Sequence, residues 1–128
     1  MRLLLDTHAL IWLFEGNPRL SATAREAIDD PRAEVHVSAV SALEITTKYR
    51  IGKLPGARQL VERFVPLMTT YGFHALPISL EHAHAAGLLI GSHRDPFDRL
   101  LIAQALTDDL TLVSNEVLFD TFAVARRW

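Results

Sequence analysis

Short apolar runs alternate along this chain with segments whose apolar spacing is helical, and this alternation is the feature that most restricts the fold. Strands that alternate with helices form a parallel sheet, because each helix carries the chain back to the same end of the sheet. The expected strands are residues 3–5, 35–37, 74–78, 111–113 and 122–124. The sequence therefore predicts an α/β fold, a three-layer α/β/α sandwich around a central, mostly parallel five-stranded sheet.

Helical patterns fill the intervals between these strands. The expected helices are residues 9–15, 22–29, 42–51, 58–71, 80–90 and 96–107, with a short helical turn after Ser114. Ser21 and Asp95 stand where helix caps are expected. Pro66 predicts a kink or a split in the fourth helix, because proline has no amide hydrogen to donate. The length suits one domain over residues 1–128.

The composition restricts the possible chemistry. The chain has no cysteine, so disulfides and thiolate metal sites are excluded, and a reducing cytoplasm is the expected location. No apolar stretch is long enough to span a membrane. The net charge of -2 does not attract nucleic acid as a whole. Nucleic-acid binding would therefore need local basic patches or bound cations.

Acidic residues follow several of the expected strands. Asp6 ends the first strand, Glu44 lies in the helix after the second, Asp98 opens the helix that begins near Asp95, and Glu116 follows the fourth strand. Ligands of a parallel sheet bind beyond the carboxyl ends of its strands, so these carboxylates can converge. Converging ionised acids repel one another unless a cation neutralises them. Oxygen ligands select Mg²⁺ or Mn²⁺, and these ions suit phosphodiester hydrolysis.

Helix capping is the competing explanation for these acids, since helix starts favour negative charge. Ser41 and Glu44 have the spacing of a capping box, and Asp95 is followed three positions later by Asp98. Asp6 is the exception because it follows three leucines on a strand that should be buried. The metal hypothesis therefore depends first on Asp6 and then on the joint pattern.

Four ordered segments of the chain resemble the signature segments of PIN-domain ribonucleases, and VapC toxins most of all. The segments are Leu4-Leu5-Asp6-Thr7-His8-Ala9, residues 38–45, residues 93–105 and Leu112-Val113-Ser114-Asn115-Glu116. The resemblance runs from residue 3 to residue 128 and implies a PIN-like sandwich. It also implies that Asp6, Glu44 and Asp98 are catalytic acids that bind Mg²⁺ or Mn²⁺.

Glu116 falls where many members of this family carry an aspartate, and the resemblance makes it the fourth catalytic and metal-binding acid. Its side chain is one methylene longer, so it ranks below the other three. Asp95 is a rival ligand, although a helix cap is the favoured role. Thr7 and Ser114 are candidates to hydrogen-bond the acids and fix their orientation.

The resemblance further implies a metal-dependent endoribonuclease that is the toxin of a VapBC-type toxin-antitoxin pair. Water would attack the RNA phosphodiester in line, and a 3′-hydroxyl would leave. The implied partners are an RNA substrate, such as a tRNA, a cognate VapB-like antitoxin whose tail occupies a groove near the active site, and a second copy of the chain in a homodimer.

Two other functions stay open. One is a non-catalytic PIN-like module that binds RNA or protein. The other is a small-molecule phosphate-ester hydrolase with Asp6 as nucleophile. The hydrolase is disfavoured, because such enzymes have a second aspartate two positions later, where this chain has His8.

Several cations and histidines lie outside the acidic set. Lys48 is explained by the helix dipole, but it also lies one turn from Glu44 and, like Arg94 and Arg99, is a candidate for contact with a phosphate backbone. His82 and His84 do not share a helix face, so surface or partly packed positions are expected.

Aromatic residues give no evident base-stacking site in the sequence, since Trp12 and Phe14 occupy apolar helix positions. The apolar run over residues 10–14 surrounds most of its helix. Core burial explains most of this run, and part of it is available to a partner.

Overall fold

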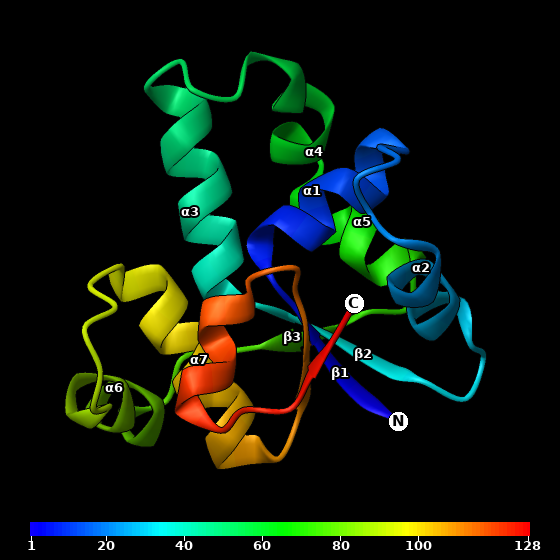
Figure 1. The fold of residues 1–128 in the computed structure, drawn as a ribbon. Helices are drawn as coiled ribbons and strands as arrows, with labels where there is room; N and C mark the ends of the chain where they lie inside the picture. Colours follow the sequence, from blue (N-terminus) through cyan, green and yellow to red (C-terminus); the bar gives the residue numbers. More distant parts are fainter.

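The computed structural model describes residues 1–128 and confirms the α/β/α sandwich (Figure 1). The strands are β1 (Arg2–Leu5), β2 (Glu34–Ser38), β3 (His74–Leu76), β4 (Thr111–Val113) and β5 (Arg126–Arg127). They form one sheet in the order β3-β2-β1-β4-β5, and every neighbouring pair is parallel. The strand order reverses at β1, so the crevice beyond the carboxyl ends of β1 and β4 is the expected ligand site.

Helices cover both faces of this sheet. The α-helices are α1 (Thr7–Glu15), α2 (Ala22–Asp29), α3 (Ala39–Arg50), α4 (Arg58–Glu62), α5 (Phe64–Thr70), α6 (Leu80–Leu88) and α7 (Pro96–Asp108). Two 3₁₀ helices, η1 (Pro55–Ala57) and η2 (Val117–Phe122), complete the fold. None of these helices has the length and apolar character needed to cross a membrane.

The alternation of side chains along β1 divides the core between the two faces. Leu3 and Leu5 belong to a cluster that includes residues of α1, α2 and α5, whereas Leu4 packs with Leu101 and Ile102 of α7. All three leucines of β1 are fully buried. A strand covered on both faces must be apolar throughout, and Asp6 is the first polar side chain at its carboxyl end.

The position of the last strand was predicted wrongly. Residues 122–124 are not a strand, because Phe122 ends η2 and Ala123 has a left-handed backbone with φ 57°. Val124 is buried in the core as a loop residue, and its apolar character produced the strand pattern. The true β5 has only two arginines, and Arg126 pairs with Leu112 of β4.

Helix α3 begins three residues earlier than predicted. Ser38 Oγ accepts a hydrogen bond of 3.0 Å from the amide of Val40, so Ser38 is the cap. The predicted capping box of Ser41 and Glu44 is therefore wrong. Ser41 is fully buried instead, and its hydroxyl lies 2.9 Å from that of Thr7.

The fourth predicted helix is divided at Arg63 into α4 and α5, as Pro66 indicated. Pro66 lies in the first turn of α5, where a missing amide hydrogen costs no helical hydrogen bond. The predicted caps are confirmed. Ser21 accepts from the amide of Ala24, and Asp95 accepts from the amide of Phe97.

A buried polar network joins the helices behind the sheet edge. His82 is buried, contrary to the expected surface or partly packed position, and its Nε2 lies 3.1 Å from Asp108 Oδ2. Its Nδ1 accepts from the amide of Ser79 at 3.0 Å. Gln104, also fully buried, accepts from Ser38 Oγ at 2.6 Å. The network therefore connects α7 to the start of the helix that holds Glu44.

Replacing Gly91 tests the loop between α6 and α7. Gly91 has a φ of +152°, and an added Cβ would lie 2.9 Å from the ring of Phe122. We expect Gly91→Ala to lower the free energy of unfolding by about 1–3 kcal/mol, because the residue is strained and crowded there. Chemical denaturation measures the change.

Gly87→Ala is the matched control. Gly87 lies inside α6, and an added Cβ would meet no atom within 4 Å. Alanine should therefore raise the free energy of unfolding by roughly 0.5–1 kcal/mol. Equal changes in the free energy of unfolding would contradict the strain and crowding that we assign to position 91.

Candidate metal centre

Asp6 lies at the junction of β1 and α1. It occupies the N-cap position of α1, yet its side chain makes no capping hydrogen bond. Its Oδ2 instead accepts a hydrogen bond of 2.7 Å from Ser114 Oγ, which lies just beyond β4. Only 4% of Asp6 is exposed. The carboxylate is therefore held beyond the sheet edge rather than used to begin a helix.

Glu44 lies in the second turn of α3 and is 4% exposed. Its Oε2 accepts a hydrogen bond of 2.6 Å from Lys48 Nζ, one turn further along the helix. Its Oε1 is the single buried side-chain nitrogen or oxygen of the chain that has no hydrogen-bond partner. A buried polar atom without a partner is costly, so this oxygen calls for a ligand.

Asp98 lies in the first turn of α7, and its Oδ2 is 2.7 Å from His93 Nε2. Burial raises the pKa of Asp98 to about 6. The hydrogen bond to His93 opposes this rise, whereas the charges of Asp95 and Asp6 add to it. Asp95 itself caps α7, and its Oδ1 accepts hydrogen bonds from the amides of Phe97 and Asp98 rather than contacting another carboxylate. Asp95 thus acts on the Asp98 carboxyl group through its charge.

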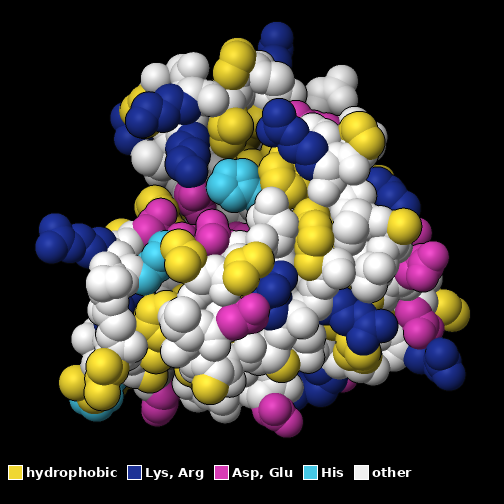
Figure 2. All heavy atoms as spheres, viewed as in Figure 1, with side chains coloured by type: hydrophobic (Ala, Val, Ile, Leu, Met, Phe, Trp, Pro, Cys, Tyr) yellow, Lys and Arg dark blue, Asp and Glu magenta, His cyan; other side chains and the backbone are white.

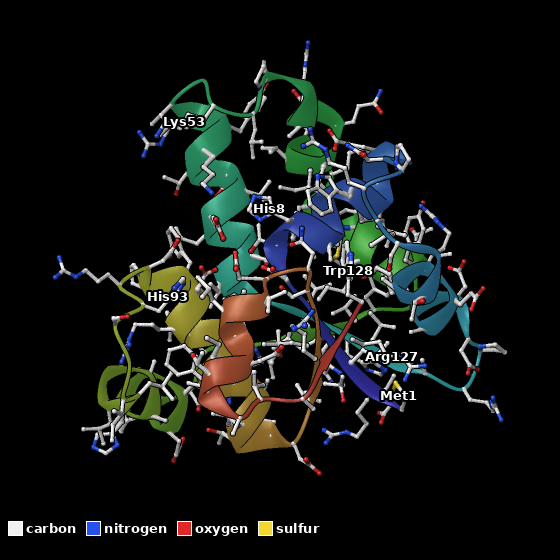
Figure 3. All side chains as sticks on the ribbon, in the orientation of Figure 1. Met1, His8, Lys53, His93, Arg127 and Trp128 are labelled. Atoms are coloured by element: carbon white, nitrogen blue, oxygen red, sulfur yellow. The ribbon has the colours of Figure 1, made fainter.

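Asp6 and Glu44 also lie close enough for their charges to interact. Burial raises the pKa of Asp6, and the charge of Glu44 contributes to the rise, against the hydrogen bond from Ser114. In Figure 2 the acidic side chains gather in a hollow at the left, with Lys and Arg side chains above them. The labels of Figure 3 identify the histidines on its two sides as His8 and His93.

The donor set of this hollow fits Mg²⁺ or Mn²⁺, because it consists of carboxylate oxygens and includes the unpartnered Oε1 of Glu44. No three acidic or histidine side chains lie close enough to hold an ion in the observed arrangement. Lys48 and His93 each contact one oxygen of these candidate metal-binding carboxylates. Metal binding would therefore require side-chain movements.

Glu116 is less closely joined to the other acids. It occupies the N-cap position of η2, and its Oε1 accepts a hydrogen bond of 3.5 Å from the amide of Leu118. Its own amide donates to Ser114 Oγ at 3.0 Å, so the backbone rather than the carboxylate connects it to Asp6. Its place among the metal ligands stays a prediction.

Two residues of the site were not predicted to contact the acids. His93 lies in a loop five positions before Asp98, where no periodic pattern indicates a contact. The helical spacing indicated that Lys48 lies close to Glu44. It did not predict that the two side chains form an ion pair. Arg99 was one candidate for a phosphate contact, and in the structure its guanidinium donates to three backbone carbonyls around the α6–α7 loop.

Thr7 does not orient an acid, since its hydroxyl pairs with Ser41. Ser114 does so and confirms that part of the prediction. Arg94 is exposed beside His93 and remains free to meet a phosphate.

Comparison with known proteins identifies the family. The model of the PIN domain matches residues 3–124. The chain belongs to the PIN domain family. Ribonuclease VapC16 of Mycobacterium tuberculosis is 38% identical over 74 residues, which cover 55% of this chain and 51% of that protein. The match with that curated relative thus spans about half of its length.

Solved structures agree with this PIN domain in fold. A VapBC2 complex from Rickettsia felis, bound to a fragment of promoter DNA, matches with a TM-score of 0.75 at 15% identity. The match covers 98% of this chain and 97% of the other. VapBC-1 from nontypeable Haemophilus influenzae gives a TM-score of 0.72 at 16% identity, covering 98% and 96%.

Removing the charge of Asp98 should stabilise the metal-free protein. The pKa of Asp98 rises from 3.8 to about 6, so the folded state binds more protons than the unfolded state between these values. Ionising Asp98 therefore lowers stability as the pH rises through this window. We expect Asp98→Asn to raise the free energy of unfolding at pH 7 by up to about 3 kcal/mol. The gain should vanish below about pH 4, and a gain independent of pH would contradict the assignment.

Lys48→Met should have the opposite effect at Glu44. The substitution keeps the apolar stem but leaves both oxygens of a buried carboxylate without a partner. We expect it to lower the free energy of unfolding by about 1–3 kcal/mol without metal. Lys53→Met is the control, because Lys53 is exposed and has no acidic partner, and it should change stability by less than about 0.5 kcal/mol. Equal losses would show that Glu44 does not depend on Lys48.

Proposed function

We propose that this PIN domain is a metal-dependent endoribonuclease and the toxin of a VapBC-type pair. The observation that carries the proposal is the buried, unpartnered Oε1 of Glu44, which lies in the same hollow as Asp6 and Asp98. An oxygen-rich hollow of this kind suits a divalent cation. The name of the Mycobacterium tuberculosis relative and the VapBC complexes among the structural neighbours support the activity and the pairing.

Asp6, Glu44 and Asp98 are the residues that we propose to hold Mg²⁺ or Mn²⁺, with Glu116 as the outermost candidate. When bound, the ion supplies charge neutralisation at the phosphoryl oxygens and a water ionised near neutral pH. Ser114 keeps Asp6 in place through its hydrogen bond.

The cationic and imidazole groups that contact the acids have a second role in this proposal. Lys48 Nζ and His93 Nε2 each lie within 2.7 Å of an acidic oxygen, at 2.6 and 2.7 Å. A phosphodiester bound at the acids would therefore be within their reach. Lys48 and His93 would hold the scissile phosphate by hydrogen bonds and counter the negative field of the hollow.

The partners that we propose are RNA, with tRNA as one candidate, a VapB-like antitoxin and a second copy of the chain in a homodimer. A groove of about 460 Å³ between α1, η1, α4 and α5 offers an apolar surface for an antitoxin segment. Ile11, Phe14 and Leu60 line it. We propose a cytoplasmic location, where RNA substrates are found.

The enzymatic proposal predicts RNA cleavage that depends on both metal and Asp6. Purified protein should cleave cellular RNA when Mg²⁺ or Mn²⁺ is added, and Asp6→Asn should reduce the rate by about 100-fold or more, because a metal ligand is lost. Mapping the fragment ends by sequencing would also identify the cleaved RNA.

Glu26→Gln is the control for this experiment, since Glu26 is an exposed carboxylate on α2, and it should retain the full rate. Cleavage that persists in excess chelator would overturn the metal-dependent mechanism. Metal binding without cleavage of any RNA would favour the non-catalytic module, and turnover of a chromogenic phosphate ester would favour the small-molecule hydrolase.

A further inference from the structure

An aromatic strip runs from the acidic hollow along the outer side of α1. It consists of His8, Trp12 and Trp128. The ring centroids of His8 and Trp12 are 5.7 Å apart, and those of Trp12 and Trp128 are 5.9 Å apart. His8 is exposed, and the two tryptophans are half-buried. The chain thus brings residues from its two ends into one continuous aromatic surface.

The strip is continuous with the acidic hollow. His8 follows Asp6 by two residues, and among the influences on the pKa of Asp6, after burial and Ser114, the charge of His8 lowers it. Trp12 lies one helical turn beyond His8 on the same face of α1. Figure 3 labels His8 near the start of α1 and Trp128 below it in the view, at the end of the chain. In Figure 2 hydrophobic side chains flank the central histidine.

Core packing explains only part of this arrangement. Trp12 and Trp128 each have one side against the larger core cluster, but both keep exposed surface. The guanidinium carbon of Arg19 lies 6.0 Å from the centre of the Trp12 ring, so a cation borders the strip. Exposed aromatic rings with a neighbouring arginine are the groups on which unpaired bases stack, while the cation meets the phosphate backbone.

We propose that His8, Trp12 and Trp128 form a stacking site for unpaired bases of RNA that flank the phosphate held at the acids. The proposal rests on the ribonuclease function proposed above and specifies its substrate as single-stranded at this point. Duplex RNA keeps its bases stacked on one another, so it cannot use the strip. The apolar groove on the other side of α1, lined by Ile11 and Phe14, is a separate surface.

Intrinsic fluorescence offers a direct test, because the chain contains two tryptophans and both belong to the strip. Asp6→Asn protein in excess chelator is titrated with a short single-stranded oligoadenylate, so that binding is measured without cleavage. Base stacking should quench the tryptophan emission. An RNA duplex of matched length and inorganic polyphosphate, which supply charge without free bases, should leave the emission nearly unchanged.

Substitutions on the same background separate stacking from packing. Trp12→Leu and Trp128→Leu should each weaken oligoadenylate binding by about 5- to 100-fold, the range expected for one lost base–aromatic stack. Trp12→Phe keeps an aromatic face and should bind within about 5-fold of the parent. Tyr71→Leu is the matched control, because Tyr71 is an exposed aromatic that packs on Phe14 at the other surface, and it should bind normally.

The proposal is overturned if oligoadenylate leaves the emission unchanged, as expected for a strip that serves a protein partner instead. It is also overturned if polyphosphate or duplex quenches equally, or if folded Trp128→Leu protein binds like the parent. Circular dichroism establishes whether each variant is folded, and the quenching of the unsubstituted strip decides the matter even if Trp12→Leu does not fold. Metal-dependent cleavage by the wild-type chain tests the ribonuclease separately, so the strip can fail while the ribonuclease stands.

Discussion

Burial of the Asp6 carboxylate is the constraint on which the rest of the site depends. β1 is covered on both faces, so the chain leaves the sheet through three fully buried leucines and places Asp6 where little water remains. An ionised carboxylate in such a place needs compensation from its surroundings. Ser114 supplies one hydrogen bond, because β1 and β4 are neighbours whose carboxyl ends meet, yet the pKa of Asp6 stays raised. The fold thus holds a buried carboxylate at a position where a neighbouring positive charge would be favourable.

The side chains of the protein supply only part of the positive charge that the buried acids favour. Lys48 contacts Glu44 and His93 contacts Asp98, but no cationic side chain bonds to Asp6. A core evolved for stability alone would replace these acids or pair them fully, since buried charges with incomplete partners lower stability. Local rules of packing and polar satisfaction are broken in real proteins mainly where function requires it. The incomplete pairing around Glu44 Oε1 is therefore better explained by a ligand than by folding.

The sequence predicted those features that depend on local pattern and strand order. Apolar runs located β1, β2 and β4, and position after a strand selected Asp6. Its side chain is buried and makes no capping hydrogen bond, although α1 begins directly after it at Thr7. Features set by tertiary packing were not predictable. β5 has two arginines and no apolar run, so only its pairing with β4 defines it. The contact of His93 with Asp98 likewise depends on tertiary packing, because Arg99 holds the preceding loop through a hydrogen bond to the carbonyl of His93.

Helix α1 connects the acidic site with the aromatic strip. It begins at the residue after Asp6, so the helical rise fixes Trp12 about 9 Å along the axis from the acid. Its apolar run surrounds most of the helix, as a fully buried helix would require, but the structure buries Leu10 and Ile11 and leaves Trp12 half-exposed with Trp128 against it. The apolar surface of α1 that the core does not bury thus lies at a fixed distance from the carboxylates. A helix that had only to fill the core would not need aromatic side chains on that face.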